Sequence, residues 1–311
     1  MQNHKVLVVG DIMLDHYTYG SCNRISPEAP VPVFEYCHEE KMLGGAGNVV
    51  KNLVSLGVEC DIISLIGADN AAIEIKYLFD KIGVKSNSLI TEDNRPTTIK
   101  QRFIASNQQL LRLDVETKDE INDLTEETLL KEFHGKVNDA DLVILSDYLK
   151  GMLTFNLCQN IISHCKSIGK RVLIDPKGND YSKYKGAFLV KPNLKEFNQI
   201  TNKIHSLEVD IEMSARNLKE LLEIETLVVT LGEKGIYALN NESVFSPTIP
   251  SEVFDVSGAG DTVLACLSYG ILADYNLDLL CKFANGGASI VISKFGSHTA
   301  TIEEIKDKIK E

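Results

Sequence analysis

The chain has 311 residues, of which 44% are hydrophobic and 24% charged, so it can bury a sizeable core. Its net charge of −12 and the absence of a basic cluster argue against nucleic acid or an anionic membrane as a partner, although a few local cations could still bind a small anionic substrate. The seven cysteines form no CxxC pair, and no signal sequence or run of eighteen apolar residues occurs, which predicts a soluble cytoplasmic protein with reduced thiols.

The first predicted element is a strand over residues 5–15, whose near-continuous apolar run is typical of a parallel strand buried on both faces. Residues 31–36 alternate between apolar and polar side chains, which predicts an edge or half-exposed strand. Pro30 and Pro32 limit the pairing of that strand, because proline has no backbone N–H to donate.

Residues 43–67 predict a glycine turn, a helix that ends at Gly57, and a second buried strand. The alternation of helix and strand then continues, except over residues 95–114. That segment predicts a β-hairpin with its turn at residues 105–108.

The second half of the chain predicts further strands over residues 141–146, 171–176, 186–193, 226–232 and 235–240, with helices between the earlier ones. This alternation predicts an α/β fold with a mostly parallel central sheet and helices on both faces. No linker or repeat occurs, so one domain is expected over residues 1–311. Residues 14–43 and 95–114 are expected to pair as a small separate β-sheet, a lid over the active-site edge.

Several common motifs are absent. "LGGAGNVV" lacks the third glycine of a dinucleotide-binding G-x-G-x-x-G, so it indicates either close strand–helix packing or a backbone approach to a polyhydroxy ligand. The chain contains no G-x-x-x-x-G-K-[ST], H-E-x-x-H or G-x-S-x-G, which argues against a P-loop NTPase, a zinc protease and the commonest hydrolases.

The segment "DVSGAGD", residues 255–261, carries the strongest chemical signal. Its small residues leave backbone N–H groups uncovered at the start of an apolar helix, where an anion such as phosphate binds. Asp261 lies just inside the helix, where the dipole favours its ionised form, and it can accept a proton from a hydroxyl. Such a division of labour suits a kinase. The alternative is an ordinary helix start capped by Ser257 or Asp255.

The sequence resembles the ribokinase-like (carbohydrate kinase) superfamily across essentially its whole length. "DVSGAGDTV" resembles the second signature of that superfamily, "GGAGNVVKNLVSLGVECDIISLIG" resembles the first, and "GDIMLD" precedes both. Within the superfamily, "RISPEAPVPV", "NQQLLRLD", "SDYLKG" and "DPKG" resemble the branch of D-glycero-β-D-manno-heptose 7-phosphate kinases.

The resemblance implies catalytic and sugar-binding residues. Asp261 corresponds to the catalytic base. The expected anion hole is formed by the N–H groups of Gly258, Ala259 and Gly260. Asp15 corresponds to a ligand of the sugar hydroxyls, although without the resemblance a turn residue after a strand is the preferred interpretation. The expected sugar-contacting loop holds Gly44, Gly45 and Asn48.

For the nucleotide side, the resemblance assigns Asn193 and Glu196 to the metal and phosphates, often through water, whereas the spacing alone is that of a capping box. Asn285 is expected beside the adenine. Asp255 is expected to help hold a monovalent cation, as in some relatives. The residues expected near the triphosphate and ribose are Thr230, Gly232 and Gly235.

A sugar phosphate requires positive charge at the far end of the cleft. Arginine suits bidentate phosphate recognition, and Lys177 follows the carboxyl end of a strand, where open α/β sheets bind ligands. For each candidate the alternative is an ordinary solvated side chain. The candidates are Arg24, Lys177, Arg102, Arg112 and Lys150.

The implied reaction is transfer of the γ-phosphoryl group of ATP, with Mg²⁺, to O1 of a heptose 7-phosphate, in ADP-heptose synthesis for lipopolysaccharide or surface polysaccharide. The exposed edges of the lid predict a homodimer. No H-x-G-H motif follows the kinase match, so a separate nucleotidyltransferase is expected downstream. The alternatives are a kinase for another sugar or sugar phosphate, and a non-catalytic sugar or nucleotide sensor.

Overall fold

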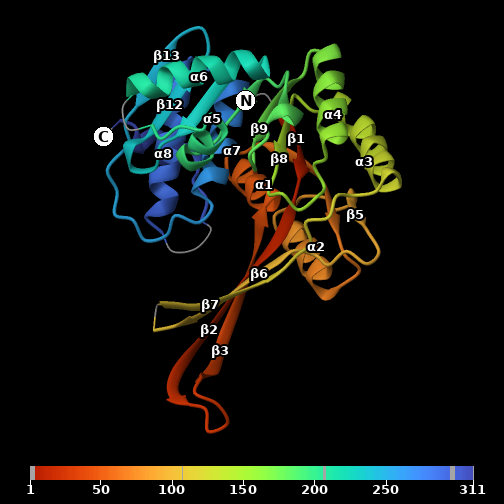
Figure 1. Cartoon of the computed structure of the whole chain (residues 1–311), viewed down its shortest axis with the longest axis vertical. Coiled ribbons are helices and arrows are strands. Elements are labelled where there is room, and N and C mark those ends of the chain that lie inside the picture. Colours follow the sequence, from red (N-terminus) through yellow and green to blue (C-terminus); the bar gives the residue numbers. More distant parts are fainter. Residues whose placement is uncertain (1–3, 107, 206–207, 295–297, 311) are drawn as a thin grey trace.

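The computed structural model describes residues 4–106, 108–205, 208–294 and 298–310, which fold around two β-sheets (Figure 1). The large sheet contains Lys5–Gly10 (β1), Glu59–Ile66 (β4), Leu89–Thr91 (β5), Leu142–Ser146 (β8), Arg171–Asp175 (β9), Leu189–Val190 (β10), Thr226–Thr230 (β11), Ile236–Leu239 (β12) and Ser243–Ser246 (β13). The small sheet contains Ile12–Ile25 (β2), Pro32–Gly45 (β3), Ile99–Ala105 (β6) and Gln108–Val115 (β7).

The large sheet has the strand order β13-β12-β11-β10-β9-β8-β1-β4-β5. All neighbouring pairs from β11 to β5 are parallel, which confirms the predicted mostly parallel sheet. β12 and β13 are antiparallel additions at one edge. β5 and β13 are not among the predicted strands, because each is short and only partly apolar.

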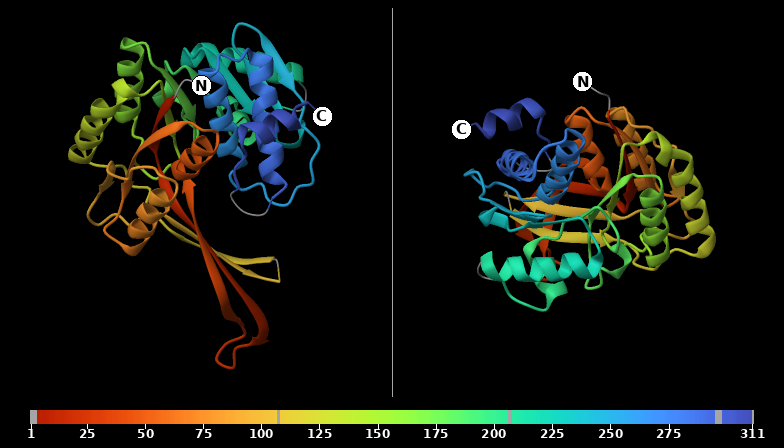
Figure 2. Two further views of the ribbon diagram at one scale, coloured as in Figure 1. Left: turned by 180° about the vertical axis from the view of Figure 1, so that it is seen from behind. Right: turned by 90° about the horizontal axis from the view of Figure 1, so that it is seen from above.

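Helices cover both faces of the large sheet, as predicted (Figure 2). One face carries Ala46–Ser55 (α1), Asn70–Lys81 (α2), Ala259–Leu272 (α7), Leu277–Ile292 (α8) and Ile302–Lys308 (α9), and the other carries Asp123–Lys136 (α3), Phe155–Ser167 (α4), Leu194–Thr201 (α5) and Glu208–Leu222 (α6). Short 3₁₀-helices span Val137–Asp139, Ser182–Tyr184 and Gly232–Lys234.

Two hydrophobic cores follow from this layering. Successive side chains of a strand point to opposite faces of a sheet. Val6 and Val8 of β1 therefore lie in the core beneath α1 and α7, whereas Leu7 and Val9 lie in the core beneath α3 and α4. A strand buried on both faces needs apolar residues at every position, which explains the continuous apolar run of β1.

The small sheet has the order β3-β2-β6-β7 and combines the two segments that were expected to pair. The hairpin of β2 and β3 extends well away from the body of the molecule (Figure 1). The predicted hairpin at residues 95–114 is present as β6 and β7, although Asn107 in its turn lies outside the described residues. β3 is an edge strand, as its prolines indicated.

Residues 5–15 do not form one strand, contrary to the prediction. The chain leaves the large sheet at Asp11, where the buried carboxylate accepts backbone N–H groups of another loop, and it enters the small sheet at Ile12. Among the described helices, none has the length and apolar character that crossing a bilayer requires.

Candidate active site

Asp261 lies in the first turn of α7, at the point where the chain enters the helix from a tight turn. Gly258 is the N-cap residue, and its φ of 76° lies in the left-handed region that favours glycine. Asp261 is only 5% exposed. The predicted helix start is thus present, with Asp261 just inside it.

The Asp261 carboxylate accepts one hydrogen bond on each oxygen. The Tyr148 hydroxyl donates to Oδ1 at 2.5 Å, and Asn48 Nδ2 donates to Oδ2 at 2.7 Å. Burial raises the pKa of Asp261, while these two donors and the charge of Lys191 oppose that rise. The expectation of a carboxylate ionised by the helix dipole is therefore incomplete, because burial acts against ionisation and other residues must counter it.

The expected anion hole lies at the start of α7, where the first N–H groups of a helix have no acceptor in a preceding turn. The Ala259 N–H bonds weakly to the Val256 carbonyl at 3.3 Å. The ammonium of Lys191 faces this turn, since a Cβ added at Gly260 would lie 3.7 Å from its Nζ. Lys191 is buried and pairs with Asp175 at 3.0 Å. Burial raises the pKa of Asp175 to about 6.

These groups surround a small cavity of about 150 Å³ in front of α7. The cavity joins the carboxyl ends of β8, β9, β10 and β11, where an open α/β sheet binds its ligands. Its charged and polar walls include Asp147, Tyr148, Asp175, Lys177, Lys191, Glu196 and Asp261. A phosphoryl group in this space would lie close to both the helix start and the carboxylate.

Asn193 and Glu196 form a capping box at the start of α5. The Asn193 side chain accepts the Glu196 N–H at 2.9 Å, and Glu196 Oε2 accepts the Asn193 N–H at 2.9 Å. Glu196 Oε1 pairs with Lys177 Nζ at 2.5 Å. Because both oxygens of Glu196 are engaged, a magnesium ion beside it would be held through water, which suits the reluctance of magnesium to dehydrate.

A larger cavity of about 1360 Å³ lies beyond the capping box. It has room for a nucleotide, and its walls include the predicted residues Asn193, Thr230, Gly232, Gly235 and Asn285. The Asn285 amide donates to both the carbonyl and the hydroxyl of Ser246 at 2.9 Å, so its N–H groups hold the neighbouring chain in place.

The sugar-binding residues expected near the start of the chain lie together at the base of the small sheet. Asp15 on β2 lies opposite Met42 of β3, two positions before Gly44. Its carboxylate packs directly against Gly44, since a Cβ added there would lie 2.2 Å from Asp15 Oδ2. Gly45, with a φ of 58°, is the N-cap residue of α1. Asn48, which was expected to face the sugar, is buried and directs its amide to Asp261.

A group of cations lies on the same face of the small sheet as Asp15. Arg102 Nη1 bonds to Asp15 Oδ1 at 2.7 Å, and Arg112 faces Arg102 across β6 and β7. Lys100 lies two residues before Arg102, and its Nζ is 5.7 Å from the centre of the Tyr148 ring. Lys150 Nζ pairs with Glu116 at 2.6 Å. Arg102, Arg112 and Lys150 were predicted from the sequence, whereas Lys100 was not.

Arg24 and Lys177 lie apart from this basic group, whereas Asp255 interacts electrostatically with Arg102. Arg24 follows Asp15 by nine residues on β2, so it is roughly 30 Å away, and it is 65% exposed beside Glu35. Lys177 lies beside Glu196, on the side expected for the triphosphate. Asp255 accepts the Ser257 N–H at 2.8 Å in the turn before α7. Within this chain, Arg24 is therefore not brought to the cavity.

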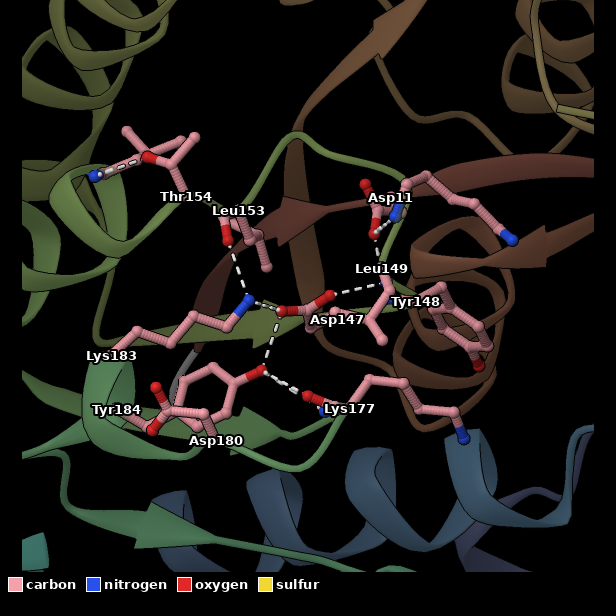
Figure 3. Close-up of polar contacts among 12 residues, drawn as sticks. Asp11, Asp147, Tyr148, Leu149, Leu153, Thr154, Lys177, Asp180, Lys183 and Tyr184 are labelled. Atoms are coloured by element: carbon pink, nitrogen blue, oxygen red, sulfur yellow. Dashed lines mark hydrogen bonds and ion pairs between the residues drawn. The ribbon is translucent and has the colours of Figure 1, made fainter. Parts of the chain in front are cut away.

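A further cluster, at the wall of the small cavity, centres on Asp147 (Figure 3). Its Oδ2 accepts Lys183 Nζ at 2.5 Å and the Tyr184 hydroxyl at 2.7 Å. Its Oδ1 accepts the Leu149 N–H at 2.7 Å. This cluster fixes the loop after β8, and none of its members is among the residues predicted from the sequence for the site.

Known proteins resemble the chain along its length. It is 45% identical over 300 residues to the bifunctional protein HldE of Aliarcobacter butzleri, a match that covers 96% of this chain and 63% of the relative. It is 46% identical over 302 residues to the bifunctional protein HldE of Wolinella succinogenes, with 97% and 64% covered. The chain thus spans less than two thirds of the length of these relatives.

Solved structures share the fold. The ribokinase of Arabidopsis thaliana complexed with ribose and ATP has 20% identity, a TM-score of 0.77 and full coverage of both chains. Phosphofructokinase-2 from Escherichia coli, in complex with substrates and products, has 18% identity and a TM-score of 0.79, with 99% and 98% covered. Residues 3–304 match the pfkB family carbohydrate kinase. The chain therefore belongs to the pfkB family of carbohydrate kinases, phosphotransferases that act on a sugar hydroxyl.

Proposed function

We propose that the protein uses ATP to phosphorylate O1 of D-glycero-β-D-manno-heptose 7-phosphate, forming the 1,7-bisphosphate. The observation that carries the proposal is the position of Asp261, between a nucleotide-sized cavity on one side and the basic face of the small sheet on the other. The similarity to HldE proteins along nearly the whole chain supports the heptose branch.

In this proposal Asp261 accepts the proton of the sugar hydroxyl as that oxygen attacks the γ-phosphorus of ATP. The bond from the γ-phosphorus to the bridging oxygen breaks, and ADP leaves. The N–H groups at the start of α7 and the ammonium of Lys191 stabilise the charge on the transferred group. Magnesium, held through water near Glu196, would neutralise charge on the phosphates when bound.

The 7-phosphate of the sugar would bind to the basic face of the small sheet. Lys100 and Arg102 are two residues apart on β6 and therefore point to the same side. Arg112 extends this face on β7. Asp15 and Asp114 currently pair with the two arginines, which holds the guanidinium groups in position for an incoming phosphate.

A kinase for another sugar phosphate is the second candidate. The basic face would recognise a phosphate group in any such substrate, and it carries no information about the stereochemistry of the sugar. A non-catalytic sensor has less support, because Asp261 and both of its hydrogen-bond donors are present.

We further expect a cytoplasmic homodimer that contacts its partner through the small sheet, and a product that passes to a nucleotidyltransferase in ADP-heptose synthesis. The seven cysteines are all thiols, in agreement with a reducing compartment. The relatives named above are bifunctional and longer than this chain. That a separate enzyme carries the nucleotidyltransferase activity is therefore a prediction. A monovalent cation near Asp255 likewise remains a prediction.

The test is ATP-dependent phosphorylation of heptose 7-phosphate, fructose 6-phosphate and ribose, with Asp261→Asn as the inactive control. We expect heptose 7-phosphate to be preferred by orders of magnitude. Lys100→Met should raise the KM of the phosphorylated sugar, while Lys41→Met, on the opposite face of the same sheet, should not. Preference for another sugar would refute the heptose assignment, and an active Asp261→Asn variant would refute the role of the base.

A further inference from the structure

The hydrogen bonds of Asp261 come from two sides of the fold. Asn48 lies in α1, which packs against α7, whereas Tyr148 lies in the loop after β8. Each donor occupies a different carboxylate oxygen, so the side chain is held at both ends. Each oxygen can accept more than one hydrogen bond, which leaves room for a substrate hydroxyl.

The Asn48 donor is fixed by a buried network. Asn52 Nδ2 donates to the Asn48 carbonyl at 2.8 Å and more weakly to Asn48 Oδ1 at 3.4 Å. The Thr262 hydroxyl donates to Asn52 Oδ1 at 2.9 Å. With Oδ1 of Asn48 facing a donor, its amide nitrogen is the atom that faces Asp261.

The Tyr148 donor is fixed by its backbone (Figure 3). Asp11 Oδ2 accepts the N–H groups of Tyr148 at 2.8 Å and Lys150 at 3.1 Å. Asp147 Oδ1 accepts the intervening N–H of Leu149, whose φ of 54° lies in the left-handed region. Two buried carboxylates thus hold three successive N–H groups, and an otherwise unfavourable loop conformation brings the Tyr148 ring to Asp261.

Other charged groups face Asp261 from the strands around it. Lys191 after β10 favours the charged carboxylate, whereas Asp15 of β2 disfavours it. Asp175 and Lys177, at and after the end of β9, interact with it electrostatically. Burial itself raises the pKa of Asp261. Neutral donors that touch the carboxylate therefore matter for keeping it able to accept a proton.

We propose that Tyr148 is a positioning residue, whose hydroxyl holds Asp261 charged and oriented to accept the proton of the sugar hydroxyl. This inference rests on the proposed function, in which Asp261 is the base. Burial also raises the pKa of Tyr148 well above its usual value. Tyr148 therefore keeps its own proton, and the proton of the sugar passes to the Asp261 carboxylate.

The test compares Tyr148→Phe with wild type across pH. Loss of a hydrogen bond to a charged group should lower kcat roughly 10- to 100-fold at neutral pH. Since the donor lowers the pKa of Asp261, its removal should move the acid limb of kcat/KM to higher pH, with activity partly recovered in alkaline buffer. The matched control is Tyr181→Phe, because the Tyr181 hydroxyl is buried and has no hydrogen-bond partner among the described residues.

A second measurement needs no substrate. Carbon-13 NMR of labelled aspartate, with the Asp261 signal assigned from Asp261→Asn, should show a higher carboxyl pKa in Tyr148→Phe than in wild type. An unchanged titration, or a fall in rate with an unshifted pH profile, would overturn the role of Tyr148. If wild type turns over none of the sugars but the Asp261 titration shifts, the hydrogen-bonding role stands and the proposed substrate fails.

Discussion

At the scale of single residues, Lys191 is the cation that sits deepest in the site. Its side chain is 3% exposed, and it pairs only 3.0 Å from a buried carboxylate, Asp175. Removing two charges from water costs more than one ion pair usually returns, so such a pair is weak support for stability. Its position beside Gly260 instead suits an anion that arrives with the nucleotide.

Lys191→Met keeps the apolar stem of the side chain and removes the charge. We expect kcat to fall about 10²- to 10³-fold, the effect typical of losing one group that stabilises transition-state charge. The fold should persist, because Asp175 can take up a proton more readily than an ordinary aspartate, its pKa being raised to about 6. Steady-state kinetics and circular dichroism check this. An unchanged kcat would contradict the proposed role of Lys191. The control is Lys282→Met, which removes a lysine from an exposed ion pair with Asp278 on α8.

From local spacing alone, the residues of the reaction centre could be predicted only where they share one segment. Asp261 and Gly258 lie three positions apart, so their juxtaposition follows from local geometry. Tyr148 and Lys191 approach Asp261 from the ends of other strands. Their separation from Asp261 along the sequence does not reveal that they lie close to it in the folded chain. A signal did exist, because Tyr148 follows the predicted strand 141–146 by two residues and Lys191 lies near the end of the predicted strand 186–193, and ligands bind at the carboxyl ends of such strands.

At the scale of elements, the loop at residues 147–151 joins the two sides of the site. It presents Tyr148 to Asp261 and Lys150 to Glu116. Asp11 holds this loop from the short connection between β1 and β2. The sequence predicted one strand through that connection, since the residues on both sides of Asp11 are apolar. Only the tertiary contacts of the carboxylate reveal why the chain changes sheets there.

Asp11 should make stability depend on pH. Burial and the nearby charge of Asp147 raise its pKa to about 6, so the folded chain holds this proton more tightly than the unfolded chain. The folded state is therefore most stable with respect to Asp11 at low pH, where this carboxyl is protonated in both states. That part of the stability is lost as the pH rises through about 6. An asparagine at position 11 does not titrate, so the variant does not lose this stability as the pH rises. We expect the stability of Asp11→Asn relative to wild type to increase by about 2 kcal/mol between about pH 4.5 and 7.

Urea unfolding of both proteins at several pH values measures this difference directly. A relative stability that stays constant across the range would show that Asp11 titrates at its ordinary pKa. The catalytic rate of Asp11→Asn at neutral pH is a useful companion measurement, because the amide oxygen can still accept the N–H groups of the loop.

At the scale of the whole molecule, the small sheet separates two environments. The face with Asp15, Lys100 and Arg112 is polar and turns towards the site. The other face of β7 presents Leu111, Leu113 and Val115 to solvent on an edge strand. An apolar row beside unpaired backbone groups is a common pairing surface, and a second copy of the chain would cover it. The sequence predicted the hairpin that contains β7, but not which of its faces turns towards the large sheet.

Leu111→Glu tests this surface. The side chain is 59% exposed, so the charge is harmless in a monomer but would be buried between two copies. In a twofold-symmetric dimer the Leu111→Glu substitution occurs once in each subunit, so two leucine contacts are lost. The dissociation constant of the dimer should therefore rise roughly a hundredfold or more. Analytical ultracentrifugation should show a wild-type dimer and a monomeric variant. Leu124→Glu, at an exposed leucine on α3, should remain dimeric. A wild-type monomer would contradict the predicted homodimer, and a variant that still dimerises would place the pairing surface elsewhere.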